Sequence, residues 1–276
     1  MLNVGPLAFD IPAVMGILNV TPDSFSDGGR FAGRDAALRH AEAMARDGAA
    51  IIDVGGESTR PGAADVSAQE ELDRVLPVIE AVVGAVDVPV SVDTSKPVVM
   101  RAAVGAGAIM INDIRALREE GALQAAVELQ CPVCLMHMQG QPRTMQQEPV
   151  YGDVVAEVAE FLAQRVRACV AAGLSEDSII VDPGFGFGKT RRHNIELLAN
   201  LRQLRPVGRP ILVGLSRKST LGALTGRDVE ERLPASLAAA VIAFLEGAAI
   251  VRVHEVKETV DALRVAAAVL ERDRDR

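Results

Sequence analysis

Eight short apolar runs, separated by stretches of helical composition, are the feature that most limits how this chain can fold. The runs are 13–18, 50–54, 88–92, 108–111, 132–136, 178–181, 210–215 and 248–253. Most lack a regular alternation of polar residues, which is typical of parallel strands covered on both faces. Segments rich in Ala, Leu, Glu and Arg lie between them, for instance 35–47, 69–83, 153–171 and 234–246. We therefore predict strands and helices that alternate along the chain.

Eight strands that alternate with helices predict a closed (β/α)8 barrel, a TIM barrel of the α/β class, formed by residues 1–276 as a single domain. Hydrophobic residues make up 49% of the chain, but aromatic residues only 3%, and Trp is absent. The core must then consist mainly of small and aliphatic side chains, which suits closely packed strands and helices. A doubly wound open sheet is the alternative architecture.

Charge and composition argue against several classes of protein. Lys and Arg number 29 against 37 Asp and Glu, which gives a formal net charge of −8. A nucleic-acid-binding domain should instead carry a basic surface, so we expect no nucleic-acid partner. No apolar run reaches the length of a membrane span, about 18 residues, and the N-terminus lacks the pattern of a secretory signal. With three cysteines that cannot all pair, these features predict a cytoplasmic protein without a membrane partner.

Polar residues stand at the end of every predicted strand. They are Asn19, Asp53, Asp93, Asn112, His137, Asp182, Ser216 and Arg252. Any one of them could simply cap a turn or the next helix. In a barrel, however, the carboxyl ends of all strands meet at one rim, where the active sites of this fold lie. Polar residues at all eight ends therefore predict a functional site at that rim.

Several short motifs suggest other functions, and each fails at a defining position. Segment 182–190 resembles a phosphate loop, but Pro183 stands where that loop needs Gly. Its alternating glycines also miss the spacing of a dinucleotide-binding loop. Segment 214–218 has Lys where a nucleophile elbow needs Gly. Cys131 and Cys134 have the spacing of a redox pair but lead into a strand, so we interpret them as core residues.

The predicted rim combines cations with hydrogen-bonding groups suited to a heterocycle. The cations are Arg60, Arg217, Lys218, Arg252 and His254. In an otherwise acidic protein they indicate an anionic ligand such as a phosphate or pyrophosphate. Asp93, Asn112 and Asp182 supply acceptors and an amide that could pair with the edge of a planar heterocycle. The rim therefore indicates a heterocyclic substrate that carries a phosphate.

Six segments resemble, in order, the motifs of one family. They are 16–29 (GILNVTPDSFSDGG), 53–63 (DVGGESTRPGA), 91–97 (SVDTSKP), 182–189 (DPGFGFGK), 214–219 (GLSRKS) and 252–254 (RVH). This set resembles the dihydropteroate synthases, the transferases of bacterial folate biosynthesis, and it spans residues 16–254. The resemblance implies a reaction that joins 6-hydroxymethyl-7,8-dihydropterin diphosphate to 4-aminobenzoate and releases pyrophosphate. It also implies a (β/α)8 fold, bound Mg2+ and a homodimer.

The resemblance also assigns roles by position. Asn19 would contact Mg2+ and the diphosphate, and Arg252 and His254 would hold the diphosphate. The pterin would be held by Asp93, Asn112, Asp182 and Lys218, with Met136 packed on its ring. Thr59, Arg60, Pro61, Phe187, Lys218 and Ser219 would surround the aminobenzoate. The family's carbon–oxygen bond is thought to break before the amine attacks, which makes Asp93, Lys218, Arg252 and His254 the expected catalytic residues.

Two other functions remain open at this point. A pterin-binding methyltransferase domain would keep Asp93, Asn112 and Asp182 but would not need the segments 21–29 and 58–60, which are present here. A non-catalytic paralogue that only binds pterins would be expected to lose the anion and metal residues, yet these remain at Asn19, Lys218, Arg252 and His254.

Overall fold

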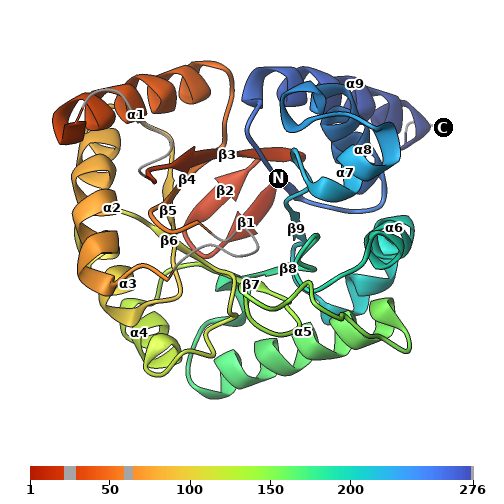
Figure 1. Cartoon of the computed structure of the whole chain (residues 1–276), viewed down its shortest axis with the longest axis horizontal. Coiled ribbons are helices and arrows are strands. Elements are labelled where there is room, and N and C mark those ends of the chain that lie inside the picture. The colour runs from red at the N-terminus through yellow and green to blue at the C-terminus, as the bar shows by residue number, and fades with distance from the viewer. Residues whose placement is uncertain (22–28, 59–64, 275–276) are drawn as a thin grey trace.

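The protein forms a closed barrel of parallel strands surrounded by helices (Figure 1). The computed structural model describes residues 1–21, 29–58 and 65–274. Eight strands form one sheet in the order β8-β7-β6-β5-β4-β3-β10-β9. A bridge between Val181 of β8 and Ile211, just before β9, joins the two ends of this order. The (β/α)8 architecture is therefore confirmed, and the doubly wound open sheet is excluded.

The elements follow the predicted alternation. The barrel strands are β3 (Ala13–Asn19), β4 (Ile51–Gly55), β5 (Val90–Asp93), β6 (Met110–Asp113), β7 (Val133–Met136), β8 (Ile179–Asp182), β9 (Leu212–Val213) and β10 (Ile250–Val253). The helices are α1 (Gly29–Arg46), α2 (Ala68–Val83), α3 (Pro97–Gly105), α4 (Ala122–Leu129), α5 (Val154–Ala171), α6 (Arg191–Ala199), α7 (Ser219–Thr225), α8 (Leu233–Leu245) and α9 (Val256–Arg274). Within the described ranges, no helix combines the length and the apolar character that crossing a membrane requires.

Side-chain alternation along the strands separates two cores and places polar groups inside the barrel. Outward-facing residues such as Ile52 and Val92 pack against the helices. Inward-facing residues such as Met15 and Ile250 form a smaller apolar cluster inside the barrel. Because successive side chains point to opposite faces, the residue two positions later also faces inward. The inward-facing residue that follows the apolar one is Asp53 on β4, Asn112 on β6, Asp182 on β8 and Arg252 on β10.

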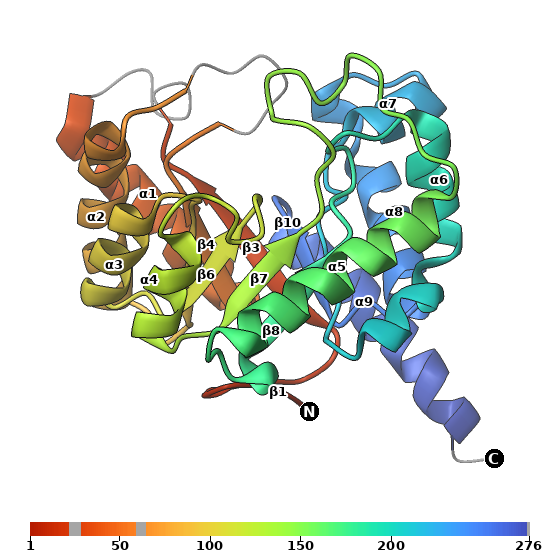
Figure 2. The same cartoon turned by 90° about the horizontal axis from the view of Figure 1, so that it is seen from below.

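An antiparallel hairpin, which the sequence analysis does not predict, closes the lower end of the barrel, where the barrel strands begin. Its strands are β1 (Leu2–Val4) and β2 (Leu7–Phe9). Val4, Leu7 and Phe9 are buried in the same cluster as the lower inward-facing strand residues. Figure 2 shows β1 and the N-terminus at this end, while α7 lies at the opposite end. The apolar floor therefore leaves only the carboxyl ends of the strands for a polar site.

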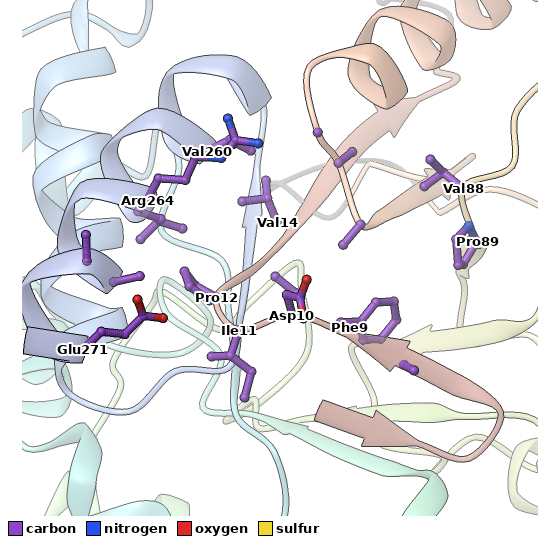
Figure 3. Close-up of a pocket in the computed structure, with 18 of the residues that line it drawn as sticks. Phe9, Asp10, Ile11, Pro12, Val14, Val88, Pro89, Val260, Arg264 and Glu271 are labelled. Atoms are coloured by element: carbon purple, nitrogen blue, oxygen red, sulfur yellow. The ribbon is translucent and has the colours of Figure 1, made fainter. Parts of the chain in front are cut away.

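A cavity of about 630 Å³ lies at the amino-terminal end of the barrel, away from the strand ends that carry polar residues (Figure 3). It is bounded by β2, by residues just before β3, β4 and β5, and by α9, and includes Phe9, Pro89 and Arg264. None of the residues that the sequence assigns to the functional site lines it. This cavity is therefore not the functional site indicated by the sequence.

A buried carboxylate fixes the turn that follows β6. Asp113 is fully buried, and its oxygens accept hydrogen bonds from Ser95 Oγ, from Arg115 N–H at 2.8 Å and from Leu117 N–H at 2.8 Å. Ala116 and Leu117 both adopt positive φ angles, 54° and 55°, which non-glycine residues rarely do. The carboxylate thus holds a turn with unfavourable backbone geometry directly after Asn112.

We predict that Asp113→Ala lowers the free energy of unfolding by about 2–4 kcal/mol, because buried backbone N–H groups would lose their acceptor. Asp153→Ala is the matched control: Asp153 also accepts two backbone N–H groups, but it caps the start of α5 in an exposed position. There we expect a loss of about 1 kcal/mol. Urea denaturation measures both values. Equal losses in the two variants would show that burial does not increase the contribution of Asp113 to the free energy of unfolding.

Candidate active site

The barrel gathers most of the site residues that the sequence indicated at the carboxyl ends of its strands. Asn19, Asp93, Met136 and Asp182 are the last residues of their strands, Asn112 and Arg252 lie one residue before an end, and His254 follows β10 directly. Lys218 precedes α7, and Ser219 is its first residue. Thr59, Arg60 and Pro61 fall outside the described residues. The eight strand-end residues predicted to surround one rim all lie between the middle of a strand and the loop after it, with Asp53 two residues before the end of β4 and Ser216 three residues after β9.

Arg252 connects two carboxylates across the barrel mouth, one fully buried and one partly buried. Its Nε lies 2.6 Å from Asp53 Oδ2, and its Nη2 lies 2.9 Å from Asp93 Oδ2. Asp53 Oδ2 also accepts a hydrogen bond of 3.0 Å from Asn112 Nδ2. Asp53 is fully buried, and its Oδ1 has no hydrogen-bond partner among the described residues. One carboxylate therefore orients an arginine and an amide that come from different strands.

Burial changes the protonation behaviour of these groups. It raises the pKa of Asp93 to about 7, although the nearby Arg252 acts in the opposite direction. It raises the pKa of Asp182 to about 6 against a 2.7 Å hydrogen bond from Gly184 N–H. Burial would lower the pKa of Arg252, but Asp53 and Asp93 hold that pKa above its usual value. Because burial removes water from the charged forms of Asp93 and Asp182, polar groups of a ligand would stabilise those forms.

Lys218 and Phe187 form a second part of the site. Lys218 Nζ lies 4.2 Å from the centre of the Phe187 ring, which is a cation–π contact. Burial lowers the pKa of Lys218 to about 8, with Arg252 adding to the effect and Asp182 opposing it. Phe187 is buried in a cluster with Met136, Met138 and Met145. The aromatic ring of Phe187 and the methionine side chains around it thus lie beside the Lys218 ammonium, which Asp182 attracts.

His254 is held by the loop that follows β9. Its Nδ1 lies 2.8 Å from Ser216 Oγ, which is also 3.3 Å from Glu255 Oε2. Glu255 forms an ion pair with Arg217, the neighbour of Ser216. Ser216 Oγ therefore connects the His254 ring to the loop that carries Arg217 and Lys218.

The described residues offer oxygen ligands for a metal ion but no protein cage around one. No group of three or more His, Cys, Asp or Glu side chains among them is arranged to hold a metal. The Asn19 amide lies near the Asp93 carboxylate, since a Cβ placed on Gly55 would be 3.8 Å from Asn19 Oδ1 and 3.6 Å from Asp93 Oδ2. Oxygen donors of this kind suit Mg2+, which usually takes few protein ligands besides phosphate oxygens and water.

Asp53 and His137 lie at strand ends, but neither side chain has the simple role of facing a ligand. The sequence places Asp53 at a strand end without a specific role, and in the structure it orients Arg252 and Asn112. His137 lies at the rim, but it points between β7 and α5, where its ring packs edge-on against Phe161. Its Nδ1 lies 2.9 Å from Lys189 Nζ. Alternation could have indicated this, because Met136 faces inward and its neighbour must face outward.

Comparison with known proteins places the chain in one family. The family model described as "Pterin binding enzyme" matches residues 15–254. The dihydropteroate synthase of Escherichia coli is 56% identical over 259 residues, which cover 94% of this chain and 92% of that protein.

Two solved structures show the same fold at similar identity. The Yersinia pestis dihydropteroate synthase, solved with a sulfonamide drug, superposes with a TM-score of 0.93 at 53% identity and covers 98% of this chain and 99% of its own. The Xanthomonas albilineans dihydropteroate synthase, solved with 7,8-dihydropteroate, gives a TM-score of 0.88 at 50% identity, covering 96% and 95%.

These relatives decide between the functions that the sequence left open. A match to a pterin-binding model alone would also suit a methyltransferase domain, but identity above half of the aligned residues over nearly the whole length does not. The rim carries the acidic, amide and cationic residues of the synthase motifs. The chain therefore belongs to the dihydropteroate synthase family, transferases that condense 6-hydroxymethyl-7,8-dihydropterin diphosphate with 4-aminobenzoate to give 7,8-dihydropteroate and pyrophosphate.

Proposed function

We propose that the pterin ring binds among Asp93, Asn112, Asp182 and Lys218, with Met136 against one face. Asp182 supports this assignment because, within the described residues, the only hydrogen bond to its carboxylate comes from Gly184 N–H to Oδ1. Its Oδ2 is available to ring N–H or amino groups, while the Lys218 ammonium can donate to a carbonyl or ring nitrogen. A ligand with this donor pattern would satisfy carboxylates that burial otherwise penalises.

The diphosphate is assigned to Arg252 and His254, and the geometry of Arg252 carries the proposal. Two of the five guanidinium N–H groups point at Asp53 and Asp93, so other N–H groups of the same fork can meet phosphate oxygens. Ser216 holds the His254 ring in place through Nδ1. The two carboxylates hold the guanidinium in place before the substrate arrives.

The aminobenzoate is assigned to the side of the site formed by Phe187, Lys218 and Ser219. Thr59, Arg60 and Pro61, which the sequence motifs assign to the same substrate, lie outside the described residues. Phe187 supports this assignment because it offers an aromatic surface next to a cation, which suits a flat, negatively charged benzoate. Lys218 contacts Phe187 and interacts electrostatically with Asp182. We therefore place this lysine between the two substrates.

The proposed roles follow the charges that the reaction develops. When the carbon–oxygen bond of the dihydropterin breaks, positive charge spreads into the ring and negative charge collects on the departing diphosphate. Asp93 would stabilise the first, and Arg252 with His254 the second, through groups already oriented by the fold. The amine of aminobenzoate is a neutral nucleophile, so it can attack the ring-bound methylene carbon without a strong base. Its proton can pass to the released pyrophosphate or to water.

We also assign Asn19 as the protein ligand of Mg2+. When bound, Mg2+ would neutralise part of the charge that forms on the diphosphate. The amide oxygen beside Asp93, and the absence of a carboxylate cage among the described residues, fit an ion that binds mainly through the substrate. We further propose a cytoplasmic homodimer in which residues 1–276 form a single domain.

Asn19→Ala should raise the Mg2+ concentration needed for half-maximal pyrophosphate release and lower kcat by at least about tenfold. Affinity for the pterin diphosphate in the absence of metal should change less than about threefold, because the ring contacts remain. Release of pyrophosphate from the two substrates, titrated with Mg2+, measures the first effect. Asn3→Ala, an exposed asparagine at the opposite end of the barrel, is the control. A metal-free affinity loss as large as the loss of turnover would contradict the assignment of Asn19.

Lys218→Ala should impair the use of both substrates, with a loss on the order of 2–4 kcal/mol in transition-state stabilisation for each, as for removal of one oriented donor. Lys218→Met, which keeps most of the apolar stem, should retain more of the aminobenzoate affinity than Lys218→Ala. Steady-state kinetics with each substrate varied in turn measure both effects. Lys257→Met, on the exposed face of α9, controls for the lost charge. Normal kcat/KM for either substrate in a stable Lys218→Ala variant would mean that Lys218 does not lie between them.

A further inference from the structure

Lys189 is a buried lysine to which neither the sequence motifs nor the proposed reaction assigns a role. It ends the segment 182–189, which resembled a phosphate loop, yet only 2% of the residue is exposed. Its Nζ lies 2.9 Å from Gly184 O, 3.0 Å from Phe187 O and 2.9 Å from His137 Nδ1, with His137 O at 3.4 Å. The ammonium therefore bonds inward to its own loop and to the residue after β7.

This environment is unusual for a lysine. Among the residues that the structure describes, no carboxylate forms an ion pair with Lys189, and its partners are carbonyl groups and one ring nitrogen. Burial lowers the pKa of Lys189 to about 7, although Asp182 acts in the opposite direction. Burial also lowers the pKa of His137 to about 2, so its ring is neutral and Nδ1 can accept a hydrogen bond from the ammonium. Such a costly arrangement needs a strong structural reason.

The loop held by Lys189 is pressed tightly against the segment after β7. A Cβ on Gly184 would lie 1.9 Å from His137 O, and one on Gly188 would lie 2.4 Å from Gln139 O. Both glycines have positive φ angles, 69° and 60°, which is why only glycine suits these positions. The ammonium is therefore placed where two backbone segments meet without room for side chains.

The same loop carries Phe187 into the site. Lys189 binds the carbonyl oxygen of Phe187, and the Phe187 ring lies 4.2 Å from Lys218 Nζ. Gly186, the residue before Phe187, also lies close to Lys218, since a Cβ placed on Gly186 would be 3.2 Å from Lys218 Cδ. A rotation of the Phe187 peptide would thus change the wall that faces Lys218.

We propose that Lys189 is a positioning residue for the aminobenzoate side of the site, where its ammonium holds the turn from Gly184 to Phe187 against His137 and so fixes the ring of Phe187. This inference rests on the proposed assignment of aminobenzoate to Phe187 and Lys218. It does not make Lys189 a catalytic residue, because its ammonium faces backbone carbonyls rather than a substrate.

Lys189→Met tests the proposal, because it keeps the length of the stem but removes the ammonium. We expect the KM for aminobenzoate to rise at least tenfold, while the Kd of the pterin diphosphate, measured by calorimetry without aminobenzoate, changes less than threefold. Tyr151→Phe is the matched control, since the Tyr151 hydroxyl donates a 2.8 Å hydrogen bond to Gly188 O in the same loop. It should change both values less than threefold.

A double-mutant cycle shows whether Lys189 acts through Phe187. Phe187→Ala alone should raise the KM for aminobenzoate, and adding Lys189→Met should then raise it less than twofold further. Equal losses of pterin and aminobenzoate binding, or independent effects of the two substitutions, would overturn the proposal. A normal KM for aminobenzoate in Phe187→Ala would instead contradict the assignment of that substrate.

If Lys189→Met does not fold, His137→Phe decides the question. It keeps an aromatic ring against Phe161 but removes the nitrogen that faces the ammonium. The KM for aminobenzoate should again rise while the Kd of the pterin diphosphate stays within threefold. Unchanged aminobenzoate kinetics in a folded His137→Phe variant would overturn the proposal.

Discussion

The ion pairs of Arg252 with Asp53 and Asp93 are the constraint on which the rest of the site depends. Removing three charged groups from water costs several kcal/mol for each ion, and close pairing offsets only part of that cost. Asp53 is fully buried, and one of its oxygens lacks a partner within the described structure. Such a cluster is a poor way to stabilise a barrel. It makes sense as a set of dipoles and charges held ready for a ligand that carries both a heterocycle and a diphosphate.

The two ends of the barrel divide stability from function. Below the charged layer, Met15, Ile51 and Ile250 fill the interior, and the β1–β2 hairpin covers them. Above these apolar residues, the inward positions are occupied by Asp53, Asn112, Asp182 and Arg252. The apolar floor keeps water from reaching the carboxylates from below, which contributes to the raised pKa values of Asp93 and Asp182. The packing of one end therefore sets the electrostatics of the other.

Much of this was predictable because the information is local in the sequence. Each predicted apolar run overlaps a barrel strand, and a polar residue at its end needs only the barrel topology to reach the rim. The short β1–β2 hairpin was missed because strands of three residues carry too little periodicity to be recognised. The role of Asp53 was missed for a different reason. Its partner Arg252 is 199 residues away, and no sequence pattern distinguishes a carboxylate that binds a ligand from one that orients an arginine.

The central claim is that Asp53 orients both halves of the site, Asn112 on the pterin side and Arg252 on the diphosphate side. Calorimetric titration of wild type and Asp53→Asn with 6-hydroxymethyl-7,8-dihydropterin and with its diphosphate tests it most directly. The account predicts that both Kd values rise at least about tenfold, because the net charge is lost and a neutral amide oxygen holds Arg252 and Asn112 more weakly than a carboxylate does. Unchanged affinity for both ligands in a variant of normal fold would contradict it.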